Sequence, residues 1–178
     1  MAKLELVQEV PDPRDERVVH VPAVEDWNPN DCTCVRAETD DGIWFGAFEK
    51  GTRSSHATGC WTVPGGDCHL VCAKGSAYLV DPTAPDRVEE LHASVAQVFV
   101  RPDGIVCTTL VDAFALRRDR IVWRARRFAL DGLKAEVVGE ELVGMATTPE
   151  GGELPFRVDL KTGAVTGGWE QRRRDEMG

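Results

Sequence analysis

Four residues between Gly59 and Ala73 could form a metal site, because thiolates and imidazoles are the usual ligands of zinc. The segment contains Cys60, Cys68, His69 and Cys72. If it folds as a hairpin that turns at its adjacent glycines, Cys68 and Cys72 share a face with Trp61, whereas Cys60 and His69 point to the opposite face. A tetrahedral site needs its ligands to converge. We therefore predict no metal site in this segment.

Cys32 and Cys34 form a C-x-C pair, which places both sulfur atoms on one side of a strand without the C-x-x-C spacing of a zinc knuckle. In a reducing compartment, free cysteine packs as a small apolar residue. We expect all six cysteines to be packing residues.

Catalytic patterns are equally sparse. Ser54, Ser55 and His56 are adjacent, but neighbours along a chain do not form a nucleophile and its base. The sequence contains no G-x-S-x-G elbow, phosphate loop or dinucleotide fingerprint. We predict no catalytic residue and no cofactor. The alternative is a small hydrolase or ligand-binding enzyme with a site at a channel mouth, built from His92, Asp112 or Asp131.

The elements that must position these residues follow a repeat. Similar units begin at Ala57, Ser94 and Leu133, and each contains four short apolar runs separated by turns. Four strands in about forty residues are typical of a propeller blade. The sequence therefore predicts an all-β fold of three to four propeller-like, four-stranded antiparallel blades, forming a small or half propeller. A meandering β-sandwich is the alternative.

The remaining segments suggest the domain limits. Residues 1–30 are rich in proline and charge, which predicts an extended N-terminal arm. Two strand-like runs, Cys32–Glu38 and Ile43–Glu49, suit half of a further blade. We predict one propeller-like domain over residues 31–170 and a frayed tail over residues 171–178.

The segment "FRVDLKTGAVTGGW" resembles the outer hairpin of quinoprotein-type propeller blades, in which Asp159, Thr162 and Gly163 match the family order. Arg157 replaces a small residue, and Trp169 stands later than in the family. The C-terminal stretch also resembles small uncharacterised bacterial half-propeller proteins. The resemblance implies a blade shape. Three or four blades are too few for the ring that holds a quinone cofactor, and their open edges suggest a homodimer as one alternative to a small closed ring.

Charge narrows the classes of partner. The formal net charge is −9 and the pI is near 4.9, which argues against a general nucleic-acid binder. No apolar run is long enough to span a bilayer, and the N-terminus lacks the apolar stretch of a signal peptide. We expect a cytoplasmic bacterial protein without membrane contact. The arginine-rich segment 117–127 is interpreted as a charged edge that resists aggregation.

Acidic residues gather in two places, and we predict that they bind a protein partner, possibly a basic one. These residues are Glu38, Asp40, Asp41, Asp86, Glu89 and Glu90. A compact acidic protein without a catalytic signature suits a non-catalytic binding module, either immunity-like or an adaptor. A flat acidic face would favour this function, whereas a deep pocket with histidine and carboxylates would favour the enzyme.

Overall fold

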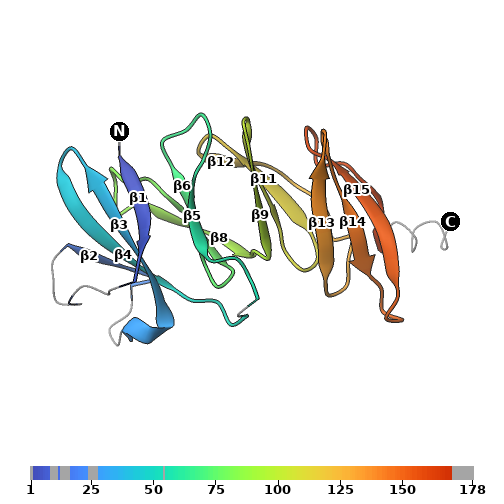
Figure 1. Cartoon of the computed structure of the whole chain (residues 1–178), viewed down its shortest axis with the longest axis horizontal. Helices are drawn as coiled ribbons and strands as arrows, with labels where there is room; N and C mark the ends of the chain where they lie inside the picture. Colours follow the sequence, from blue (N-terminus) through green and yellow to red (C-terminus); the bar gives the residue numbers. More distant parts are fainter. Residues whose placement is uncertain (1, 9–11, 13–16, 24–27, 54, 170–178) are drawn as a thin grey trace. The chain divides into compact units, whose positions relative to one another are not determined.

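The structure is a computed structural model that describes residues 2–8, 12, 17–23, 28–53 and 55–169, apart from the side chains of residues 29 and 92. The elements that lie wholly within these residues are sixteen strands and one short 3-10 helix, η1 (Pro29–Asp31). The strands form four sheets of four strands each (Figure 1). The predicted all-β fold with blade-like four-stranded sheets is confirmed. Among the described residues, no helix is long and apolar enough to cross a membrane.

The chain divides into two compact units, an N-terminal unit (Met1–Val95) and a C-terminal unit (Ala96–Gly178). The boundary between these units lies inside residues 31–170, the range that the sequence predicts as one propeller-like domain. The predicted tail, residues 171–178, lies outside the described residues.

The first sheet of the N-terminal unit contains β1 (Lys3–Val7), β2 (Val18–Val21), β3 (Cys32–Thr39) and β4 (Gly42–Glu49), in the order β1-β3-β4-β2. β1 pairs antiparallel with β3, and β2 pairs parallel with β4. β1 and β2, which lie in the segment predicted as an extended arm, are therefore strands of this sheet. The parallel pair is also an exception to the predicted antiparallel pattern.

The second sheet of this unit is a meander of β5 (Gly59–Thr62), β6 (His69–Ala73), β7 (Ser76–Val80) and β8 (Val88–Ser94). The hairpin β5–β6 has the predicted register, since Gly59 is opposite Cys72 and Trp61 is opposite Leu70. Gly65 makes this turn possible, because its φ of 73° is a conformation that side chains disfavour.

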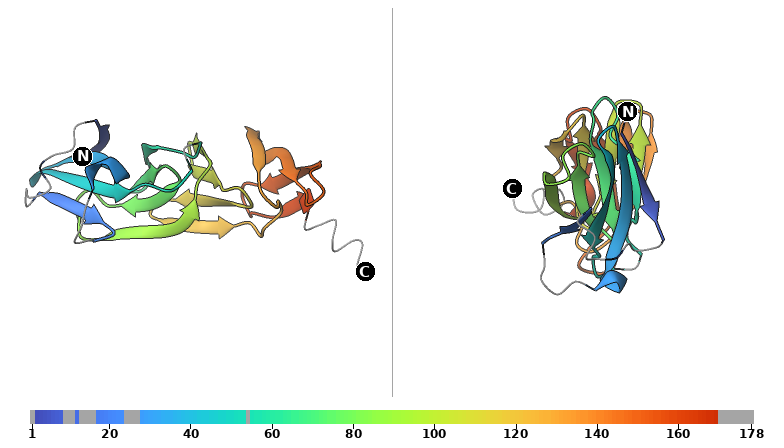
Figure 2. Two further views of the ribbon diagram at one scale, coloured as in Figure 1. Left: turned by 90° about the horizontal axis from the view of Figure 1, so that it is seen from below. Right: turned by 90° about the vertical axis from the view of Figure 1, so that its left-hand side faces the viewer.

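The C-terminal unit repeats the meander twice. One sheet contains β9 (Gln97–Arg101), β10 (Gly104–Thr108), β11 (Ala113–Arg117) and β12 (Arg120–Arg124). The other contains β13 (Leu133–Val138), β14 (Glu141–Thr147), β15 (Glu153–Asp159) and β16 (Val165–Gly167). Figure 2 shows the strands of both sheets from two further directions.

Each unit has its own core between its two sheets. In the N-terminal unit, Val35 and Phe48 of the first sheet pack with Val71 and Tyr78 of the second, and the rings of Phe48 and Tyr78 lie 5.1 Å apart. In the C-terminal unit, the rings of Phe128 and Phe156 lie 4.7 Å apart. The aromatic residues of the third strands, Tyr78, Phe114 and Phe156, are all buried.

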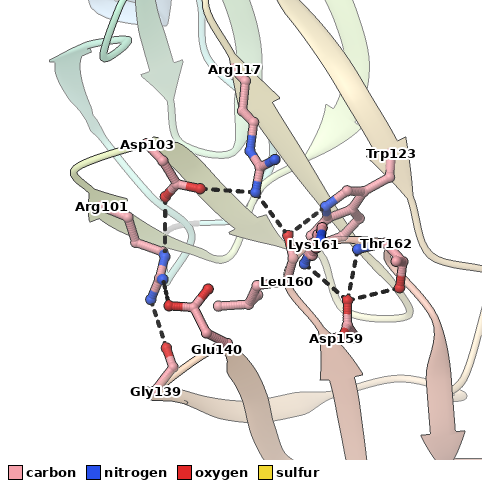
Figure 3. Close-up of polar contacts among 10 residues, drawn as sticks. All are labelled: Arg101, Asp103, Arg117, Trp123, Gly139, Glu140, Asp159, Leu160, Lys161 and Thr162. Carbon is pink, nitrogen blue, oxygen red and sulfur yellow. Dashed lines mark hydrogen bonds and ion pairs between the residues drawn. The ribbon is translucent and has the colours of Figure 1, made fainter.

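A tryptophan hydrogen bond joins the two sheets of each unit. In the N-terminal unit, Trp44 Nε1 donates to the backbone oxygen of Pro82, 2.8 Å away. In the C-terminal unit, Trp123 Nε1 donates to the backbone oxygen of Leu160, 2.9 Å away (Figure 3). Each acceptor comes directly after an Asp at the end of a third strand. Pro82 follows Asp81, which is the residue after β7, and Leu160 follows Asp159, which is the last residue of β15.

That Asp organises the turn that presents the carbonyl. Asp81 Oδ1 accepts hydrogen bonds from the backbone nitrogen and the hydroxyl of Thr83. Asp159 Oδ1 accepts the equivalent pair from Thr162 and a further one from the backbone nitrogen of Lys161. These contacts lower the pKa of Asp159, with the side-chain hydrogen bond from Thr162 as the largest cause. Asp159 and Thr162, the residues that resemble those of propeller hairpins, therefore stabilise a local turn.

Ion pairs add to the sheet contacts of the C-terminal unit (Figure 3). Arg101 bonds the backbone oxygen of Gly139 and the carboxylate of Glu140, both at 2.9 Å. Asp103 is paired with Arg101 at 3.4 Å and with Arg117 at 2.9 Å. This network connects turns of the two sheets, so these charged side chains have a structural role.

Candidate functional site

The β3–β4 turn carries two of the predicted binding residues. The Thr39 hydroxyl donates to the backbone oxygen of Gly42 and accepts from the backbone nitrogen of Asp41. Gly42 closes the turn with a φ of 126°. Asp40 and Asp41 are consequently held at an exposed tip.

This tip forms one wall of a cleft of about 570 Å³ in the N-terminal unit. The other walls come from the start of β1, the end of β5, the β5–β6 turn with the start of β6, and the segment that follows β7. In Figure 1, the start of β1, the β3–β4 turn and the β5–β6 turn lie at the same end of this unit. We name this site the acidic cleft, because four carboxylates line it: Asp40, Asp41, Asp67 and Asp81.

Burial separates the floor of the acidic cleft from its rim. Leu4, His69 and Pro82 are buried, whereas Asp40, Asp41, Asp67 and Thr83 are exposed. The Trp44 hydrogen bond to Pro82 fixes the floor to the first sheet.

His69 is the titratable group on the floor, with 5% of its surface exposed. Its Nε2 lies 3.2 Å from the hydroxyl of Thr62, which also lines the cleft. Its Nδ1 is buried and forms no hydrogen bond of normal geometry within the described residues. Burial lowers the pKa of His69, and the backbone of Asp67 partly opposes that shift. The imidazole is therefore neutral near pH 7.

Lys3 is the basic residue among the described residues that line the cleft. Its Nζ lies 2.6 Å from Glu5. The hydrogen bond and charge of Lys3 lower the pKa of Glu5, with a smaller contribution from Arg36. Because Glu5 already engages Lys3, the lining retains an excess of negative charge.

The structure divides the six predicted binding residues. Asp40 and Asp41 line the acidic cleft. Glu38 is exposed on β3 and pairs with Arg36 at 2.9 Å. The other three, Asp86, Glu89 and Glu90, are exposed in and before β8 and do not line the cleft.

Sequence reasoning missed Asp67 and Asp81, and it considered His69 only as a metal ligand. Asp67 belongs to the β5–β6 turn, and Asp81 stands at the start of the turn after β7. The signal for both was present in the turn sequences "PGGD" and "VDPT". What the sequence did not indicate is that these turns meet the β3–β4 tip.

The residues of the enzymatic alternative are placed differently. His92 belongs to the N-terminal unit, and its side chain lies outside the described residues. Asp112 Oδ1 accepts a 2.7 Å hydrogen bond from Thr109 within a turn of the C-terminal unit. Asp131 is exposed in the same unit. Ser54 is also outside the described residues, and His56 is buried with its Nδ1 2.9 Å from the hydroxyl of Ser94.

All six cysteines are free thiols. Burial raises the pKa of Cys60 and Cys72 to about 12, and it also raises the pKa of Cys34. Cys60 Sγ lies 3.8 Å from the backbone oxygen of Leu4. Among the described residues, no three His, Cys, Asp or Glu side chains gather where they could hold a metal ion.

Comparison with known proteins identifies no family. No protein-family model and no curated protein matches the chain. Among solved structures, it is similar to the crystal structure of the computationally designed Ika8 protein, with 12% sequence identity and a TM-score of 0.40. The match covers 79% of this chain and 46% of that chain, so this chain spans about half the length of the design.

Proposed function

We propose that the protein is a non-catalytic protein-binding module that engages a basic partner through the acidic surfaces of its N-terminal unit. The observation that carries this proposal is the acidic cleft, in which four carboxylates line one cavity. Exposed carboxylates around a concave site attract cationic groups and increase the rate of their capture.

The contacts of His69 support binding over catalysis. A general base is normally oriented by a third group that also stabilises its charged form. The described contacts of His69 are the Thr62 hydroxyl and the backbone of Asp67, and burial disfavours its protonated form. These features suit a neutral group that takes part in recognition.

The wider expectations belong to the same proposal. The blade-like sheets suit a propeller-type repeat in a cytoplasmic bacterial protein with an immunity-like or adaptor role. β8, β12 and β16 are edge strands of their sheets, and edge strands are where two copies of a chain can pair to form a homodimer.

Affinity capture with charge variants tests the proposal. The bait is the full chain, the Asp40→Asn, Asp41→Asn variant, or the Glu89→Gln, Glu90→Gln variant. Glu49→Gln with Glu136→Gln is the matched control, because both are exposed carboxylates outside the cleft. We expect a basic protein to be retained by the wild type and the control and lost from at least one acidic variant. Equal retention by all baits would contradict the proposal.

A small hydrolase is the second candidate, and the Thr62–His69 contact at the cleft is the observation that favours it. Under this alternative, His69 would act as base toward the Thr62 hydroxyl. Hydrolysis of activated esters by the wild type, lost in both Thr62→Val and His69→Gln, would support it over the binding module.

A further inference from the structure

The distribution of charge in the acidic cleft restricts what it can bind. Asp40 and Asp41 belong to the β3–β4 turn, Asp67 to the β5–β6 turn and Asp81 to the segment after β7. A single metal ion requires several ligands around one point. No such group of three occurs among the described residues. The four carboxylates therefore suit a ligand that carries several separate positive charges.

The floor of the cleft carries a buried imidazole. His69 is 5% exposed, its Nε2 lies 3.2 Å from the hydroxyl of Thr62, and the backbone of Asp67 is a second polar contact of the ring. Because His69 lines the cleft, a ligand that enters the cleft lies beside this ring. The imidazole can adapt, since its tautomer decides which ring nitrogen donates.

The lining of the cleft favours the basic side chains of a polypeptide over a small amine. A volume of about 570 Å³ lies within the roughly 300–1,000 Å³ typical of small-molecule sites, so the volume admits either ligand and the choice depends on the lining. The buried Leu4 and Pro82 give the floor an apolar part, which suits the aliphatic stems of lysine and arginine. The rim carboxylates suit their charged ends, and carboxylates can bond guanidinium groups through two parallel hydrogen bonds.

From these observations we propose that the acidic cleft binds an extended segment of a partner protein that carries at least two arginine or lysine side chains. The inference rests on the proposed binding function and names the chemistry of its ligand. Rim carboxylates on separate turns contact the cationic ends, while the stems lie along the floor next to His69.

A peptide titration of the full chain tests the inference. The probe is a ten-residue peptide with arginine at alternate positions, and its control has glutamine at the same positions. Backbone amide NMR signals of Asp41, Asp67 and Thr83 report on three walls of the cleft. We expect the arginine peptide to shift these signals, and the glutamine peptide to leave them unchanged.

Variants then measure the contribution of the rim. Asp40→Asn with Asp67→Asn should weaken arginine-peptide binding about tenfold or more, as loss of charged hydrogen bonds predicts. Asp40→Asn with Asp41→Asn gives a second measure at an exposed turn that is not part of the core. Glu49→Gln with Glu136→Gln makes the same change of net charge away from the cleft and should leave the affinity unchanged.

Three results would overturn the inference: no change of the cleft signals, equal binding of the glutamine peptide, or the same shifts and affinity with spermine or Ca²⁺ alone. Loss of peptide binding in the control variant would also overturn it, because it would indicate attraction by net charge only. If the peptide fails but affinity capture still depends on Asp40 and Asp41, or on Glu89 and Glu90, the cleft ligand is wrong and the proposed function stands.

Discussion

At the scale of residues, the site was only partly predictable. Asp40 and Asp41 were identified from their exposed, charged turn, and the structure places both on the acidic cleft. The predicted hairpin register also placed His69 on the face opposite Trp61, where it contacts Thr62. Its burial could not be derived, because burial depends on a second sheet that packs over this face. The spacing of residues in a sequence predicts the register of a single hairpin, but not which sheet packs against it.

The buried histidine leads to a prediction about pH. The pKa of His69 is lowered in the folded protein, so the unfolded chain binds a proton first as the pH falls below the ordinary histidine value of about 6.5. Folding free energy is therefore lost as the pH falls from about 6.5 toward the folded pKa. We expect urea unfolding to show lower stability at about pH 5.5 than at about pH 7.5.

His69→Gln should reduce this difference without removing it, because burial and the charge of Arg53 also lower the pKa of His56. Glu5 does not interfere in this range. Its lowered pKa contributes stability that is lost only at lower pH, below its ordinary value near 4.5. An unchanged pH dependence in His69→Gln would contradict the assignment.

At the scale of elements, the repeat was readable because each strand is short, apolar and bounded by turn residues. The runs predicted at Cys32–Glu38 and Ile43–Glu49 correspond to β3 (Cys32–Thr39) and β4 (Gly42–Glu49). The two N-terminal strands were missed for a physical reason. β2 pairs in parallel with β4, which lies more than twenty residues later, and local turn patterns contain no information on such a pairing.

The tryptophan hydrogen bonds between sheets lead to a prediction about stability. Trp44→Phe and Trp123→Phe each remove an indole donor and leave the carbonyl of Pro82 or Leu160 without that bond. Loss of a buried partner costs about 1–3 kcal/mol. We expect chemical denaturation to show a loss of about this size in Trp44→Phe and a smaller loss in Trp123→Phe, because the Leu160 oxygen also accepts a hydrogen bond from Arg117, 3.2 Å away. Trp61→Phe is the control, since Trp61 is half-buried and outside these two contacts. A loss as large in the control would show that ring volume, and not the hydrogen bond, is responsible.

At the scale of the whole molecule, the sequence repeat did not reveal which sheets share a core. Three consecutive units with similar strand patterns predicted one domain over residues 31–170, and the structure shows two compact units with separate apolar clusters. One difference was visible in the sequence. The third strands β7 and β15 lead into Asp-x-Thr or Asp-x-x-Thr turns, whereas β11 ends at Arg117 and is followed by Arg118 and Asp119. The apolar pattern of the strands is similar in all three units, whereas the turns that connect paired sheets differ in sequence.

The net charge of −9 leads to the last prediction, which concerns the rate of association with the captured partner. If the exposed carboxylates attract a basic protein, the association rate should fall steeply between about 0.03 and 0.3 M salt, over which the screening length shortens about threefold. Replacing Asp40, Asp41, Glu89 and Glu90 with Asn or Gln should slow association at low salt and flatten the salt dependence. The melting temperature should stay nearly unchanged, because exposed carboxylates contribute little to stability. Surface plasmon resonance with wild type and variant separates the two rate constants. An association rate that the four substitutions leave untouched would mean that these carboxylates serve only solubility.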